Sequence, residues 1–331
     1  MQGFLSELAK RLAERWISLL VLPGSLFLAV VFTAVTLGQD HSLGVSRLVD
    51  EITAYAKAPD VRSTAGQVVL LLTVLAGSAV AGLVAQALGS LMEHVTLAAG
   101  WRRWPGPLRA VTRSMVARRQ RRWKTEHDVW YAAYEAARSP DPQHRPEPSA
   151  RHRAARRRDR IALERPDRPT WIGDRMHAAA LRLDRDHHLD LATVWPHLWL
   201  ILPDDVRAEL TAMRASVSRA ATLGAWALLY APLTALWWPA APLSAVLAVV
   251  ARHRLHVTVH AFAQALEATT RLHVAALAAQ LGLTSAGATG EADGSPGQLA
   301  AQAQPQPFNR AAGRALTRYL SSRVPPPSAE S

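Results

Sequence analysis

The chain has 331 residues, of which 49% are hydrophobic, and 38 lysines and arginines oppose 26 aspartates and glutamates, for a formal net charge of +12. Because the sequence contains no cysteine, it excludes disulfide bonds, thiolate catalysis and cysteine-ligated zinc. Beside long apolar runs, the basic surplus indicates cytoplasmic loops and contact with anionic lipid, and it disfavours nucleic acid as a partner.

The N-terminal region predicts a leader helix and a first membrane span. Residues 1–16 place their apolar side chains on one helical stripe, which is typical of an interfacial amphipathic helix. Residues 17–38 carry no charge, and about 22 helical residues just cross a hydrocarbon core of ~30 Å. This run exceeds the apolar part of a secretory signal, so we expect an uncleaved span. The slightly acidic residues 39–66 are the predicted extracytoplasmic loop, with a short helix over 46–57.

Residues 67–92 predict a second span that contains a ridge of small residues. The ridge repeats every four residues, at Gly77, Ala81, Ala85 and Gly89. Small side chains let another helix approach closely, and van der Waals packing then drives association in lipid. The alternative is that the ridge only reflects an alanine-rich composition.

The charge pattern changes sharply after the second span. Residues 93–138 form a predicted basic helical region, which the positive-inside rule places in the cytoplasm. We expect its basic side chains to contact anionic lipid headgroups, in particular Arg118, Arg119, Arg121 and Arg122. Residues 139–168 are rich in proline, arginine and aspartate and predict a mobile, charged linker.

The most distinctive stretch lies within residues 169–219. Its apolar part, residues 189–203, is too short to cross a membrane and suits a helix at the cytoplasmic interface. Two aspartates at 204 and 205 then match the positive end of a helix dipole and predict a new helix. We predict a structural anchoring role for the motif residues Pro169, Thr170, Gly173, Asp190, Trp195, Pro196, Trp199 and Pro203.

This stretch and the hairpin after it, roughly residues 169–282, resemble a widespread family of uncharacterised bacterial multi-span membrane proteins. The family pattern is Pro-Thr-x-x-Gly-Asn, Tyr-Gly-x-Asp, Trp-Pro-Arg-Leu and Leu-Pro before an apolar hairpin. The matching residues are Pro169, Thr170, Gly173, Asp190, Trp195, Pro196, Leu198, Leu202 and Pro203. The departures are Asp174 for Asn, His187 and His188 for Tyr-Gly, and His197 for Arg. The resemblance implies a multi-span membrane fold and no particular activity.

The third apolar stretch, residues 220–251, is about 32 residues long, and one helix of roughly 48 Å is too long for a single span. A Trp-Trp-Pro sequence at its middle favours a hairpin with spans at 220–238 and 243–260, although one long kinked helix stays open. Residues 261–283 predict a cytoplasmic helix, and residues 284–331 a low-complexity basic tail.

Two groups of histidines could carry chemistry. His253, His256 and His260 share one helical face and could bind a metal or respond to pH, but the simpler interpretation is a polar interfacial stripe. The second group is Asp184, Asp186, His187, His188 and Asp190, which lie too close in sequence to converge on one ion. No nucleotide-binding loop and no nucleophile motif is present, so we expect no catalytic residue and no cofactor.

Together these patterns predict an all-α integral membrane protein with about four transmembrane helices and a helical basic cytoplasmic module between spans 2 and 3. We expect a multi-pass protein of the inner membrane with both termini in the cytoplasm. The expected function is a membrane-anchored, non-enzymatic interaction or effector protein. The alternatives are a small channel or transporter component, against which the spans carry hardly any ionisable residue, and a membrane-bound enzyme. Expected partners are anionic lipids, with a second copy or partner helices left open.

Overall fold

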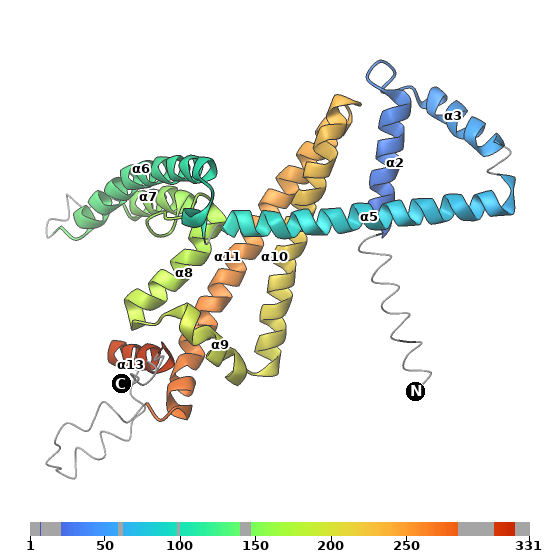
Figure 1. Ribbon diagram of the computed structural model, residues 1–331. Helices are drawn as coiled ribbons and strands as arrows, with labels where there is room; N and C mark the ends of the chain where they lie inside the picture. The colour runs from blue at the N-terminus through green and yellow to red at the C-terminus, as the bar shows by residue number, and fades with distance from the viewer. Residues whose placement is uncertain are drawn as a thin grey trace, which may run out of the picture. The chain divides into compact units, whose positions relative to one another are not determined.

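The computed structural model describes residue 7 and residues 21–58, 62–97, 100–139, 147–283 and 308–321. Across these residues every regular element is a helix, which confirms the predicted all-α class (Figure 1). The chain divides into two compact units, the first made of Met1–Val95 and Ser216–His256 and the second of Thr96–Ala215 and Val257–Ser331. The predicted leader helix, apart from Glu7, and most of the predicted tail lie outside the described residues.

The first unit begins with α2 (Leu22–Leu37) and α3 (Val45–Lys57). α2 ends at Gly38, whose φ of 60° is a conformation that glycine adopts without steric cost. α3 packs against α2, with the rings of Phe32 and Tyr55 5.9 Å apart. The predicted loop between the first two spans therefore folds back on the helix that precedes it.

A helical hairpin completes the first unit. α10 (Asp204–Tyr230) is followed by the short helix η4 (Ala231–Ala235) and by α11 (Ala240–Gln280). The hydroxyl of Ser244 donates a hydrogen bond of 2.9 Å to the carbonyl of Ala227, so the two helices lie side by side. Residues 220–251 therefore form a hairpin and not one long helix.

The loop between α2 and α3 covers the tip of this hairpin. The indole N–H of Trp237 donates to the carbonyl of Ser42 at 2.8 Å, and that of Trp238 donates to the Ser42 hydroxyl at 2.5 Å. The side-chain amide of Gln39 donates to the carbonyl of Thr234 at 3.0 Å. These bonds satisfy polar groups that the turn leaves without helical partners.

α5 (Thr64–Leu97) packs in the first unit through its small residues. Its buried side follows Ser78, Gly82, Ala85 and Gly89, while Gly77 and Ala81 of the predicted ridge are half-buried. The reason is geometric, because 3.6 residues per turn make a strict four-residue repeat drift around the helix. A Cβ on Gly89 would lie 2.9 Å from Cα of Thr222 on α10, too close for any side chain.

The rest of α5 is uncovered. Among the described helices, α5 is the one that is long and apolar enough to cross a membrane, and 17% of its most apolar window is buried. Residues 68–72 are five consecutive large apolar residues, each at least 49% exposed. α2, which is also apolar, has 16 residues within its bounds.

The second unit contains η2 (Trp101–Arg103), α6 (Gly106–Ala137) and α7 (Pro148–Ile161). α7 lies within the predicted charged linker 139–168, so the expectation of a mobile linker is wrong for that part of the chain. α7 packs along α6 (Figure 1), and its Ala154 is buried. The Arg158 guanidinium lies 4.2 Å from the ring centre of Trp130 on α6. These tertiary contacts stabilise a helix whose own sequence lacks an apolar stripe.

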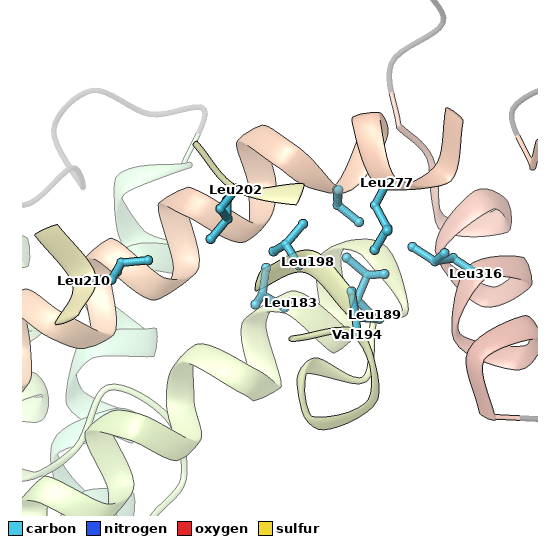
Figure 2. Packing of buried hydrophobic residues seen from close by; sticks show 9 residues of the cluster. Leu183, Leu189, Val194, Leu198, Leu202, Leu210, Leu277 and Leu316 are labelled. Atoms are coloured by element: carbon cyan, nitrogen blue, oxygen red, sulfur yellow. The ribbon is translucent and has the colours of Figure 1, made fainter. Parts of the chain in front are cut away.

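A leucine-rich core joins α8 (Trp171–His187), α9 (Leu191–Ile201) and α13 (Arg310–Ser321) to parts of α10 and α11. Figure 2 shows these side chains pointing toward one another from different helices. Such a core is what a unit of this size requires in order to fold. Its buried members are Leu183, Leu189, Val194, Leu198, Leu202, Leu210, Val274, Leu277 and Leu316.

Candidate functional site

The first motif residues fasten the start of α8. Thr170 is the N-cap of α8, where its hydroxyl oxygen accepts the backbone N–H of Gly173 at 3.0 Å. The same hydroxyl donates to the carbonyl of Thr96 near the end of α5. A Cβ on Gly173 would lie 2.6 Å from the carbonyl oxygen of Leu97, so only glycine allows this approach. Pro169 beside them is buried.

Asp174 holds together three segments of the second unit. Its carboxylate accepts hydrogen bonds from the backbone N–H groups of Asp167 and Arg168 at 2.9 and 2.8 Å. It also accepts a hydrogen bond of 2.6 Å from the guanidinium of Arg119. Burial raises the pKa of Asp174 above its ordinary 3.8, although the bonds from Arg168 and Arg119 oppose that rise. Arg119 also donates to the carbonyl of Ile161 at 2.8 Å. Arg119, predicted to contact lipid, is therefore committed to internal bonds.

The later motif residues order α9. Asp190 is the N-cap, and its carboxylate accepts the backbone N–H of Ala192 at 3.2 Å. Pro196 lies inside the helix, and the rings of Trp195 and Trp199 are 5.9 Å apart and pack on the leucine-rich core. The structure thus gives both tryptophans a packing role in the second unit. Pro203 is exposed, directly before α10.

The histidines predicted as weak metal candidates have separate surroundings on α11. His253 is exposed, and Nδ1 of His256 lies 2.7 Å from the carbonyl of Arg252. Nδ1 of His260 accepts a hydrogen bond of 3.0 Å from Nε of Arg175. Across the described part of the chain, no three or more His, Asp or Glu residues are grouped so that they could hold a metal ion.

Arg175 on α8 is a buried cation that sequence patterns do not distinguish from the other arginines. It is 2% exposed, and its Nη1 is buried without a hydrogen-bond acceptor among the described residues. Burial lowers the pKa of its guanidinium, and the charge of Arg182 adds to that effect. A buried charge is costly unless it is paired, so the hydrogen bond to His260 is an important compensation.

His188 has a conformational role. It ends α8 in the left-handed region, with φ 52° and ψ 42°, and its N–H donates to the carbonyl of Asp184 at 2.7 Å. Glycine is the usual residue at this position of a helix C-terminus, because a Cβ is disfavoured there.

An aromatic ladder on α6 lines one side of a hollow in the second unit. The rings of Trp123 and His127 stack at 4.4 Å between centres, and His127 lies 5.4 Å from Trp130. Trp123 also donates its indole N–H to the carbonyl of Ala162 at 2.9 Å. Nδ1 of His127 is buried without a partner among the described residues. The hollow has a volume of about 480 Å³, which is in the range of small-ligand sites.

Charged residues line the other side of this hollow. Arg185 forms a salt bridge of 2.6 Å with Glu164, and Arg182 lies 3.6 Å from the same carboxylate. Arg271 of α11 forms salt bridges with Glu267 at 2.9 Å and with Asp186 of α8 at 2.6 Å. Each carboxylate thus faces an arginine. Such a wall of paired charges can orient a polar group.

The remaining predicted lipid contacts lie on the outer side of α6. Arg118, Arg121 and Arg122 are exposed, unlike Arg119. α7, which lies in the predicted linker, adds exposed arginines that were not among the predicted lipid contacts. These are Arg153, Arg156, Arg157 and Arg160. The helical pair α6 and α7 therefore presents many basic side chains to its surroundings.

Comparison of the chain with protein-family models, with curated proteins and with solved structures found no match.

Proposed function

We propose that this chain is a multi-pass protein of the bacterial inner membrane, with spans at residues 17–38, 67–92, 220–238 and 243–260 and both termini in the cytoplasm. Its proposed role is that of a membrane-anchored, non-enzymatic interaction protein. The resemblance of residues 169–282 to a bacterial family of multi-span membrane proteins is part of the same proposal.

The observation that carries the membrane proposal is the bare apolar surface of α5. Residues 68–72 are all exposed, and five consecutive residues sweep more than one full helical turn. The apolar surface of this part of α5 is therefore uncovered on every side. In water such a patch would exceed what soluble monomers tolerate, whereas in lipid it is favourable.

The hairpin supports the same proposal. Residues 220–251 carry no charge, and Trp237 and Trp238 lie at the hairpin tip. Tryptophan is enriched at membrane–water interfaces, because its ring is apolar and its N–H needs a polar partner.

Two features support binding as the role of the second unit. The hollow beside Trp123, His127 and Trp130 combines aromatic rings with oriented charges, which suits recognition. Its carboxylates are paired with arginines, so the charges that line it are held in fixed positions. The exposed arginines of α6 and α7 suit anionic headgroups, each contributing on the order of 1 kcal/mol near a charged surface.

Reporter fusions test the topology. Fusions after Lys124 and after Gly282 should report the cytoplasm, and a fusion at Tyr55 should report the periplasm. The physical reason is that the arginine-rich region after α5 resists translocation. A periplasmic signal at Gly282 would remove one limb of the hairpin and leave three spans.

Lipid preference tests the proposed contact with headgroups. Phosphatidylglycerol should raise the melting temperature of the detergent-solubilised full chain more than phosphatidylcholine does. The difference should shrink at high salt and after glutamine replacement of Arg118, Arg121 and Arg122. A control that removes equal charge from the proposed outer side replaces Arg47, Lys57 and Arg62. Equal effects of the two lipids on the unaltered chain would contradict the proposal.

A further inference from the structure

α3 is strongly amphipathic. The helix has 13 residues, and a 100° step per residue separates its side chains into two arcs. The side chains on the apolar arc are Val45, Leu48, Val49, Ile52 and Tyr55. The charged side chains, on the opposite arc, are Arg47, Asp50, Glu51 and Lys57. Such a pattern normally means that the apolar arc is covered.

The first unit leaves that arc uncovered. Val45 is 69% exposed, Val49 is 54% exposed and Ile52 is 49% exposed. Not one residue of α3 is buried. Tyr55 meets the ring of Phe32 on α2 and is still 58% exposed. The contact with α2 therefore orients α3 without burying its apolar side.

Hydrogen bonds tie the start of α3 to the hairpin tip. Ser42, three residues before α3, accepts the indole N–H groups of both Trp237 and Trp238. Tryptophans prefer the headgroup level of a bilayer, so α3 begins at that level if the hairpin spans the membrane.

The charges of α3 identify what kind of surface it fits. Arg47 and Lys57 balance Asp50 and Glu51, so α3 has no net charge to attract an anionic surface. Binding would rest on the apolar arc alone, which is how an in-plane helix enters the boundary between headgroups and acyl chains. A soluble protein partner would give no reason for the apolar arc to begin at the level of Trp237 and Trp238.

We infer that α3 lies in the plane of the periplasmic membrane surface, with Val45, Val49 and Ile52 immersed among the lipids and Asp50 and Glu51 in water. This inference rests on the proposed membrane insertion. α3 then sets the depth and tilt of α2 and α5, to which it is joined at its two ends.

The absence of cysteine makes the test direct. Single-cysteine variants of the full chain would be labelled with an environment-sensitive fluorophore and reconstituted into phosphatidylcholine vesicles. The apolar-arc variants are Val49→Cys and Ile52→Cys, and the matched polar-arc variants are Asp50→Cys and Glu51→Cys. Leu71→Cys on α5 is the control for the span. All five positions are exposed, so the label displaces no packed side chain.

Quenching by spin-labelled lipid should be several-fold stronger at Val49 and Ile52 than at Asp50 and Glu51. Iodide on both sides of the vesicle should show the reverse order. Adding phosphatidylglycerol should leave both results unchanged, because α3 has no net charge.

Different failures are distinguishable. If Leu71 is quenched by lipid but the four α3 positions respond equally to iodide, the α3 inference is wrong and the span proposal stands. If Leu71 is also accessible to iodide, membrane insertion fails, and the inference fails with it. If Val49 and Ile52 are shielded from iodide but not quenched by lipid, a protein surface covers α3, which overturns the assignment to lipid.

Discussion

Replacing Gly313 by alanine tests how α13 is held on the second unit. A Cβ at Gly313 would overlap the carbonyl oxygen of His187 and lie 3.5 Å from Cγ of Leu189. A backbone oxygen at the end of a packed helix cannot rotate away as a flexible side chain can. α13 must therefore move outward, and Leu316, which is 0% exposed, must move with it.

Two opposing effects set the magnitude for Gly313→Ala. In an isolated helix the change from glycine to alanine is favourable by about 1 kcal/mol. Against this, withdrawing Leu316 from the core loses roughly 2–3 kcal/mol of apolar burial. The loss is larger, so docking of α13 should weaken by about 1–2 kcal/mol. Since 1.4 kcal/mol is a factor of ten, the undocked population should rise roughly tenfold.

Limited trypsin digestion of the full chain in detergent measures that population. Arg314 and Arg318 on α13 are exposed, and cleavage there tracks the undocked fraction when re-docking is faster than cleavage. Gly313→Ala should accelerate cleavage roughly tenfold. Leu316→Ala is the positive control, because it removes the same buried contact. Cleavage of Gly313→Ala at or below the unaltered rate would refute the overlap, because helix propensity would then be the larger effect.

Three further predictions concern α8 and α9. His188→Gly should raise the free energy of unfolding by about 0.5–1 kcal/mol, because glycine removes left-handed strain, whereas His188→Ala should give no gain in thermal unfolding. Burial, assisted by Arg168, lowers the pKa of His177 below its ordinary 6.5. The contribution of neutral His177 to the free energy of unfolding is therefore complete above pH 6.5 and is lost as the pH falls through the pKa of the folded state. Melting temperatures measured from pH 7.5 to 5.5 should fall less steeply in His177→Gln than in the unaltered chain. Trp195→Ala should cost about 2 kcal/mol, because the ring is only half-buried, and unchanged stability with a lost phenotype would reassign this residue to a functional site.

Local patterns were enough to predict several elements. α10 begins at Asp204, where two aspartates match a helix N-terminus, and the Trp-Trp-Pro sequence lies between α10 and α11. The apolar length of α5 is equally a property of sequence. In each case the determining interaction lies within a few residues along the chain, so composition and periodicity record it.

The basic region shows where such patterns fail. Arg119 and Arg121 are two residues apart and chemically identical, yet Arg119 bonds the buried Asp174 and Arg121 is exposed. The difference depends on which side of α6 faces α8, and that is decided by packing. The structured part of the predicted linker follows the same logic, because Arg158 is held against Trp130 by a contact between two helices.

The sequence by itself determined that the chain is helical, where the hairpin turns and which helix is long and apolar enough to cross a membrane. Only the tertiary structure decided which arginines are buried and that the apolar arc of α3 is left uncovered. It also decided that Ser78 and Gly82 of α5 are buried more deeply than Gly77 and Ala81. The physical reason is that helix formation depends on neighbours along the chain, whereas burial depends on neighbours in space. Residues of the same type can have similar neighbours along the chain and still have different neighbours in space.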